Sequence, residues 1–285
     1  MSRTFLASLH FDGTGFVGWQ RQPAGRSVQL EFERVLERLF EQPAPAHAAG
    51  RTDAGVHALG LGVSFSTPDR WTAPALRRAI NALLPPDCWV GSVHAMAPGF
   101  HARKSARSRR YRYDVGTDEA SASPFRRPFE WALRRPLDAG ALRAAATLLQ
   151  GEHDFRAFAA VGEPRPHYRC RLAVAEWAER PEGRGVSFHV EADRFLHHMV
   201  RLLVGTMVDI GRGRRPLSDI DLLLERGDNQ RTSPPAPPEG LYFVRAAYPP
   251  ALFLAGEEVA DPPRPGERAE EAPDAVARVA VVRDA

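Results

Sequence analysis

The chain has 285 residues, of which 44% are hydrophobic and 26% charged, and a net charge of +3, as is typical of a soluble globular protein with a sizeable core. No apolar run approaches the roughly 18 residues of a transmembrane helix, and the start turns polar too soon for a signal peptide. Cys88 and Cys170 lie far apart without CxxC or Cys/His spacing, which favours reduced thiols in a cytoplasmic protein over a disulfide framework or zinc site.

Strands and helices mix along the chain without strict βαβ repetition. In the first part of the chain we expect a strand over 4–11, a helix over 27–42, a strand over 57–66, a helix over 73–84, and strands over 88–96 and 110–115. In the second part we expect a helix over 139–150, an antiparallel strand pair over 168–179 and 185–192, helices over 195–211 and 216–227, and a strand over 240–248. The fold class that follows is α+β, with a mostly antiparallel sheet covered on one side by helices. The open face of such a sheet has room for a polymer.

The last part of the chain differs in charge from the rest. Between residues 256 and 285 there are eight acids and four arginines, so this segment carries −4 and the rest of the chain +7. From this acidic charge excess we expect a disordered acidic tail over 251–285.

One carboxylate occupies an unusual place. Asp53 lies in the run GRTDAGVHALG, between Arg51 and His57, on a glycine-bracketed turn before the strand over 57–66. An isolated acid in a loop is most often a turn former or a helix cap. Here, however, glycines let the backbone approach a ligand, a nearby cation favours the ionised acid, and the following strand anchors it. Asp53 is therefore a candidate site residue.

Basic residues cluster in one segment. HARKSARSRRYR, residues 101–112, holds six basic residues, one tyrosine and no acid. On charge alone, a solvated basic face and a nucleic-acid contact strip are about equally good explanations.

Other combinations are weaker. His197 and His198 suggest a metal only superficially, because neighbours on a helix point about 100° apart and no third ligand is suitably spaced in sequence. His153 and Asp154 are adjacent and rarely meet, so a fold role is expected. Asp12 is a turn residue by default, and the glycines after it lack the spacing of a dinucleotide site.

Several motifs together resemble one family. FDGTGFVGWQRQP, GRTDAGVHA, NALLPPD, FHARKSARSRRYRYDV, GEHDFRAF, RFLHHMVRLLVGTMVDIG and TSPPAPPEGLYFVRAAY occur in the order found in the tRNA pseudouridine synthase A family. The resemblance covers residues 4–249, and departs at Leu61-Gly62, where the family usually has Gln-Val, and at Lys104, where an aromatic is common.

The resemblance implies a fold, an activity and partners. It implies a pseudouridine synthase fold, with two related halves, 1–105 and 106–250, which share the sheet around a central RNA-binding cleft. The activity is isomerisation of uridine to pseudouridine at nucleotides 38 to 40 of the tRNA anticodon arm. The implied partners are tRNA and a second copy in a homodimer, and the implied reaction needs no cofactor and no metal.

The resemblance also implies roles for single residues. Asp53 matches the catalytic aspartate, and Arg201 in FLHHMVR matches an arginine paired with it. Tyr111 matches a tyrosine that stacks on the flipped uracil, although alternation puts Tyr113 on the same strand face. Arg51 matches a residue that fills the space the base leaves, and a phosphate contact or a structural salt bridge is a nearly equal alternative for it. RNA contacts are expected from Arg103, Lys104, Arg107, Arg109 and Arg110.

The chemistry of the reaction agrees with a single carboxylate. Breaking the C1′–N1 bond leaves an electron-deficient sugar centre, which a carboxylate can add to or stabilise, provided that a cation keeps it ionised in a dry site. Two alternatives stay open. A catalytically silent RNA-binding module predicts loss of Asp53, Tyr111 or Arg201, and a glycoside- or nucleoside-cleaving hydrolase predicts a second carboxylate within reach of Asp53.

Overall fold

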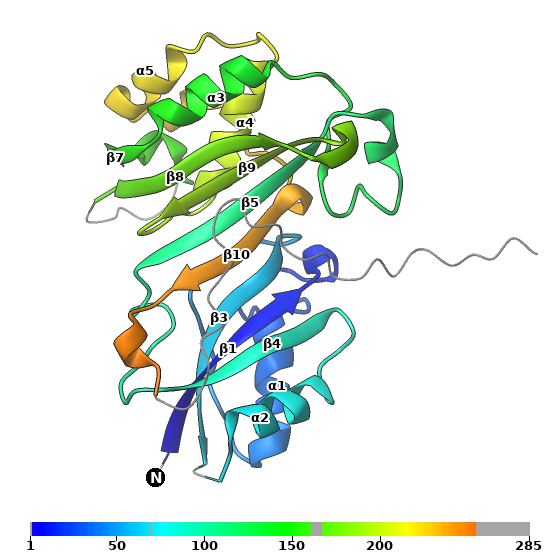
Figure 1. Ribbon diagram of the computed structural model, residues 1–285, viewed down its shortest axis with the longest axis vertical. Coiled ribbons are helices and arrows are strands. Elements are labelled where there is room, and N and C mark those ends of the chain that lie inside the picture. Colours follow the sequence, from blue (N-terminus) through cyan, green and yellow to red (C-terminus); the bar gives the residue numbers. More distant parts are fainter. Residues whose placement is uncertain (1, 69, 161–166, 255–285) are drawn as a thin grey trace, which may run out of the picture. The chain divides into compact units, whose positions relative to one another are not determined.

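The computed structural model describes residues 2–68, 70–160 and 167–254, and these contain one sheet of ten strands (Figure 1). Its main path runs β4-β1-β3-β10-β5-β9-β8-β7, with β2 paired to β3 and β6 to β5. The strands are β1 (Ser2–Phe11), β2 (His47–Ala48), β3 (His57–Pro68), β4 (Cys88–Met96), β5 (Ser108–Gly116), β6 (Trp131–Ala132), β7 (Gly151–Asp154), β8 (Arg169–Glu179), β9 (Gly185–Ala192) and β10 (Leu241–Ala247). Neighbours are antiparallel except for the pairs β10–β3 and β5–β6.

Five α-helices accompany the sheet. They are α1 (Val28–Phe40), α2 (Ala73–Asn81), α3 (Ala139–Leu148), α4 (Met199–Gly211) and α5 (Asp219–Arg226). Local chemistry sets several helix starts, because the side chains of Ser27, Thr72 and Asp138 each accept a hydrogen bond from a backbone N–H of the first turn. Helix α4 has almost no polar face, and eleven of its thirteen residues are buried. No helix in the described ranges is long and apolar enough to cross a membrane.

Strand β10 lies in the middle of the sheet and connects the strands β4-β1-β3 to the strands β5-β9-β8-β7. It lies between β3 and β5, although it is the last strand in sequence (Figure 1). In the parallel pairing with β3, Tyr242 is opposite His57, and in the antiparallel pairing with β5, Phe243 is opposite Tyr111. The beginning of β3, just after the Asp53 turn, and the middle of β5 are therefore held one strand apart.

The sequence-based expectations for the fold are confirmed in outline. The class is α+β with a mostly antiparallel sheet, and β8 and β9 form the expected antiparallel pair. The two-residue strands β2 and β6 and the short edge strand β7 were not expected. The division at residue 105/106 stays a prediction, and residues 255–285 of the expected tail lie outside the described residues.

One boundary was wrong in a way that matters for the site. The expected helix over 195–211 begins only at Met199, because His198 adopts a left-handed backbone conformation with φ 62°. His197 and His198 therefore lie in the turn that leads into α4 and do not have helical spacing.

The departure at Leu61-Gly62 has a packing reason. Leu61 is fully buried in the core, and a Cβ placed on Gly62 would lie 2.5 Å from the hydroxyl oxygen of Tyr248. Glycine at position 62 leaves room for that hydroxyl. Leu61 and Gly62 thus affect the packing of β3 and do not contact Asp53.

Candidate active site around Asp53

The turn that carries Asp53 rests on the glycine-rich loop after β1. A Cβ on Gly18 would lie 2.5 Å from the carbonyl oxygen of Thr52, and one on Gly13 would lie 2.1 Å from that of Val56. The Gly55 N–H donates to the carbonyl of Phe16, and the Val56 N–H donates back to the carbonyl of Asp53. The glycines of this loop thus permit close backbone packing, which fixes the turn beneath the carboxylate.

His57 fastens the same turn to a distant loop. Its Nδ1 accepts from the Gly13 N–H at 3.0 Å, and its Nε2 lies 2.9 Å from the Pro128 carbonyl oxygen, so the neutral ring with a proton on Nε2 fits both partners. The ring stacks on Tyr242 and is 2% exposed, and its burial lowers the pKa of His57 below the usual value. His57 is therefore a buried structural histidine that couples the Asp53 turn to β10.

Arg201 reaches Asp53 from the first turn of α4. Its Nη1 lies 3.2 Å from Oδ2 of Asp53, and its Nε donates to the carbonyl of Ala236 at 2.7 Å. Only 14% of the Arg201 side chain and 24% of the Asp53 side chain are exposed. A Cβ on Gly205, one turn further along α4, would lie 2.2 Å from the Pro234 carbonyl, so close packing of this segment on α4 holds the guanidinium in place.

Two histidines complete the surroundings of the carboxylate. His197 Nε2 lies 3.4 Å from Oδ1 of Asp53, and His198 Nε2 lies 3.4 Å from Oδ2. The two rings are 4.0 Å apart between centroids. Burial lowers the pKa of His198, with Asp53 acting in the opposite direction. Sequence spacing did not reveal this cluster, because its members are brought together only by the turn before α4.

Tyr111 and Tyr113 share a strand face but differ in environment. The Tyr113 hydroxyl donates to the Pro237 carbonyl at 2.7 Å inside the core. The Tyr111 ring packs edge-on against Phe195 and Phe243, and burial raises the pKa of its hydroxyl, with Asp53 adding to the rise. Among the described residues no hydrogen bond engages the Tyr111 hydroxyl, so it is the one of the two that is available to a ligand.

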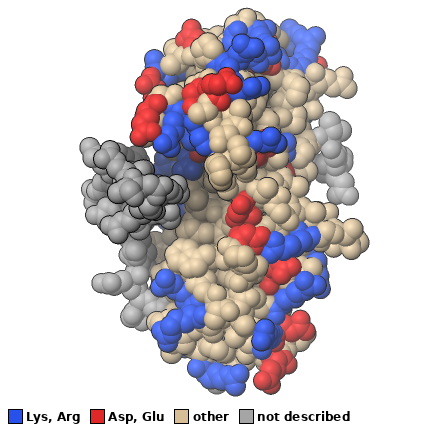
Figure 2. Space-filling model, turned by 90° about the vertical axis from the view of Figure 1, so that its right-hand side faces the viewer, with Lys and Arg blue, Asp and Glu red and all other residues tan. Residues whose placement is uncertain are grey.

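The predicted RNA-contact residues fall into two groups. Arg51, Arg103, Lys104 and Arg107 are exposed, whereas Arg109 and Arg110 are half-buried. Arg110 lies 4.0 Å from a carboxylate oxygen of Glu176 on β8. On the face drawn in Figure 2, Lys and Arg side chains gather above and below a hollow at middle height.

Arg109 is tied to the backbone. Its guanidinium donates to four carbonyl oxygens, those of Ala49, Arg103, Ala106 and Asp193. This uses four of its five N–H groups, so little donor capacity is left for a phosphate. We therefore interpret Arg109 as the residue that fixes the basic segment against the backbone before the Asp53 turn.

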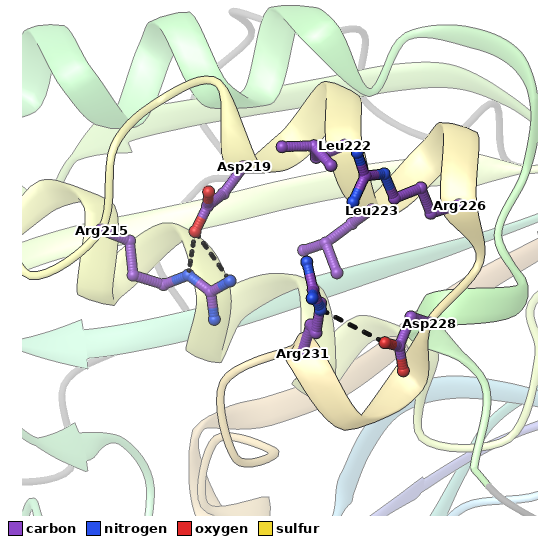
Figure 3. A pocket seen from close by; sticks show the side chains of 7 residues that line it. All are labelled: Arg215, Asp219, Leu222, Leu223, Arg226, Asp228 and Arg231. Carbon is purple, nitrogen blue, oxygen red and sulfur yellow. Dashed lines mark hydrogen bonds and ion pairs between the residues drawn. The ribbon is translucent and has the colours of Figure 1, made fainter.

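The other sequence candidates do not gather around Asp53. Asp12 caps a short turn by accepting from the N–H and hydroxyl of Thr14, and Asp154 accepts from the Arg156 N–H. A separate pocket of about 250 Å³ lies at α5 (Figure 3). Arg215 pairs with Asp219 and Arg231 with Asp228 in its wall, so its positive charge is largely compensated.

Comparison with known proteins connects this geometry to a family. A tRNA pseudouridine synthase family model matches residues 145–249. The tRNA pseudouridine synthase A of Myxococcus xanthus is 42% identical over 252 residues, which are 87% of this chain and 94% of that protein. The chain belongs to the tRNA pseudouridine synthase A family. The protein of that name from Moorella thermoacetica is 41% identical over 85% of this chain and 98% of its own length, and that from Frankia casuarinae is 42% identical over 87% and 90%.

The cluster around Asp53 consists of one carboxylate and the nitrogen atoms of Arg201, His197 and His198, which surround it. Asp53 is the only carboxylate in the group of close titratable side chains found around it among the described residues. The arrangement supplies a nucleophile or base, one permanent cation and two imidazoles.

The structural role of Arg109 is testable by stability. Replacing Arg109 with Met removes four hydrogen bonds to carbonyl oxygens, so we expect the free energy of unfolding to fall by about 1–3 kcal/mol. The matched variant Arg107→Met removes an exposed charge and should melt like wild type. Denaturant unfolding followed by circular dichroism measures both, and equal stability of the two variants would contradict the role given to Arg109.

Proposed function

We propose that this chain isomerises uridine to pseudouridine at nucleotides 38 to 40 in the anticodon arm of tRNA. The observation that carries the proposal is the contact between Asp53 and Arg201, which joins the two most informative family motifs across 148 positions of sequence. The proposal is supported by the names of the related proteins, by the single carboxylate of the cluster and by the exposed basic residues of the segment 101–112.

The proposed reaction begins with loss of the C1′–N1 bond. The uracil then turns and bonds to C1′ through C5, after which C5 loses its proton and N1 gains one. Asp53 serves as nucleophile or base at the sugar, and Arg201, whose guanidinium lies 3.2 Å from the carboxylate, compensates its charge. A cation fixed by the Ala236 carbonyl needs no reorganisation during the reaction.

Tyr111 and Arg51 are proposed to handle the base. The Tyr111 hydroxyl is protonated at neutral pH, as an ordinary tyrosine is, and burial raises its pKa further, so it can donate a hydrogen bond to the detached uracil. The exposed guanidinium of Arg51 precedes Asp53 by two residues and is proposed to occupy the space that the flipped nucleotide leaves in the stack.

The proposal includes a homodimer in the cytoplasm, where tRNA is found. Sedimentation of the full chain measures the assembly state, and a monomer at micromolar concentration would remove this part of the proposal.

Asp53→Asn tests the catalytic assignment. The amide keeps the shape of the side chain and removes only its charge, so we expect turnover to fall by at least about a thousandfold while tRNA binding is kept. Tritium release from C5-labelled uridine in tRNA measures turnover, beside a binding constant. Asp154→Asn on β7 is the matched control and should stay active. Substantial turnover by Asp53→Asn would refute the assignment.

Arg201→Met tests whether the cation acts through charge. Methionine keeps much of the packed volume but leaves the partly exposed Asp53 carboxylate without its cation, so the free energy of unfolding should fall by less than the roughly 3–5 kcal/mol of a fully buried pair. Turnover should fall about 10²- to 10³-fold. Arg212→Met, just after the other end of α4, is the control. A variant that is inactive only because it melts early would argue for a structural role instead.

The salt dependence of tRNA binding tests the exposed basic residues. Each phosphate contact contributes about 0.7–0.9 to the slope of log affinity against log salt, so Arg103→Gln with Arg107→Gln should flatten that slope by up to roughly two units. Arg34→Gln with Arg38→Gln on α1 removes the same charge from exposed positions elsewhere. If both double variants have the same slope, the segment 101–112 makes no special phosphate contacts.

A further inference from the structure

Three potential metal ligands converge at Asp53. The carboxylate and the Nε2 atoms of His197 and His198 all lie within 4.8 Å of one another, and each imidazole nitrogen is 3.4 Å from a carboxylate oxygen. In the described part of the chain, no other group of three histidine, cysteine or acidic side chains is arranged in this way.

The spacing fits a small divalent ion. In a tetrahedral site with bonds of about 2.0–2.1 Å, neighbouring ligand atoms are about 3.3–3.4 Å apart. Two imidazoles and a carboxylate are ligands that suit Zn²⁺ and Co²⁺, and three protein ligands leave a fourth position for water. A metal could therefore enter between these atoms with only small side-chain movements.

The backbone aims the imidazoles at this point. His198 has φ 62° and ψ 1°, in the left-handed region that non-glycine residues rarely adopt, and its side chain caps no N–H of α4. This conformation turns both rings toward the same carboxylate. The His197 side chain is 56% exposed, so an ion has access from solvent.

We propose that Asp53, His197 and His198 form a binding site for a divalent transition-metal ion of the Zn²⁺ type, and that the bound ion blocks the active site. The ion would bind the Asp53 carboxylate and thereby keep the sugar of the substrate away from it. It therefore acts as an inhibitor and takes no part in the isomerisation. The inhibition rests on the proposed function, whereas the binding does not.

Arg201 lowers the affinity of the site for a metal ion, and its replacement therefore tests where the ion binds. Its guanidinium lies 3.2 Å from Oδ2 and repels a second cation, while Oδ1 faces His197. Arg201→Met should therefore bind the metal more tightly than wild type. Unchanged or weaker binding would place the ion away from Asp53 and overturn the proposal.

Binding is measured on the untagged full chain with Co²⁺ as a probe. We expect one equivalent of Co²⁺ to give the visible absorption of a tetrahedral site and Zn²⁺ to abolish it. His197→Gln and His198→Gln should each weaken binding by at least about tenfold. His47→Gln is the control, because His47 stacks on His101 in a separate histidine pair. The proposed site would be refuted if His47→Gln lost as much Co²⁺ affinity as the other two variants, or if the double variant His197→Gln/His198→Gln bound Co²⁺ like wild type.

Inhibition is measured separately by tritium release, with free Zn²⁺ fixed by a nitrilotriacetate buffer so that binding of the metal by tRNA does not matter. Inhibition should follow the binding curve, be reversed by chelator, and need at least about tenfold more Zn²⁺ in His197→Gln, relative to that variant's own metal-free rate. Binding without any inhibition of an active enzyme would refute the blocking. If wild type has no turnover, the proposed function fails while the binding result stands.

Discussion

Contact between Asp53 and Arg201 is the constraint on which the rest of the site depends. Three-quarters of the Asp53 side chain is buried, and the cation 3.2 Å from its carboxylate comes from a helix 148 positions away in sequence. Close packing on both sides makes this geometry possible. Gly13 and Gly18 let the loop after β1 support the turn, and Gly205 lets the segment around Pro234 lie against α4.

Much of this arrangement could be predicted from the sequence. The elements α1, α2, β4 and β9 were predicted close to their observed bounds, because their sequence signals are local. The short strands β2 and β6 contain too few residues for a pattern. The start of α4 was misplaced because FLHHMVR continues the helical pattern, while the left-handed conformation of His198 depends on tertiary contacts.

The same difference separates the site residues that could be found from those that could not. Asp53 has a recognisable motif, whereas its two histidine neighbours are adjacent in sequence and were interpreted with helical geometry. Tyr111 and Tyr113 alternate identically, so periodicity does not distinguish them, whereas the hydrogen bond from Tyr113 to Pro237 does. Arg109 was grouped with the basic residues by charge, yet its four carbonyl partners come from three segments that no local pattern brings together.

The position of β10 has a consequence for biosynthesis. Every residue given a role in catalysis precedes residue 241, but β3 and β5 are held at their working distance only by the strand that follows it. A growing chain on the ribosome therefore contains the full set of reactive side chains well before it contains the strand that spaces them. Until β10 inserts, β3 and β5 each lack a neighbour along the part of the edge that β10 covers, and such an open edge is a template for aggregation. A polypeptide interrupted before β10 thus contains the site residues without the strand that spaces them.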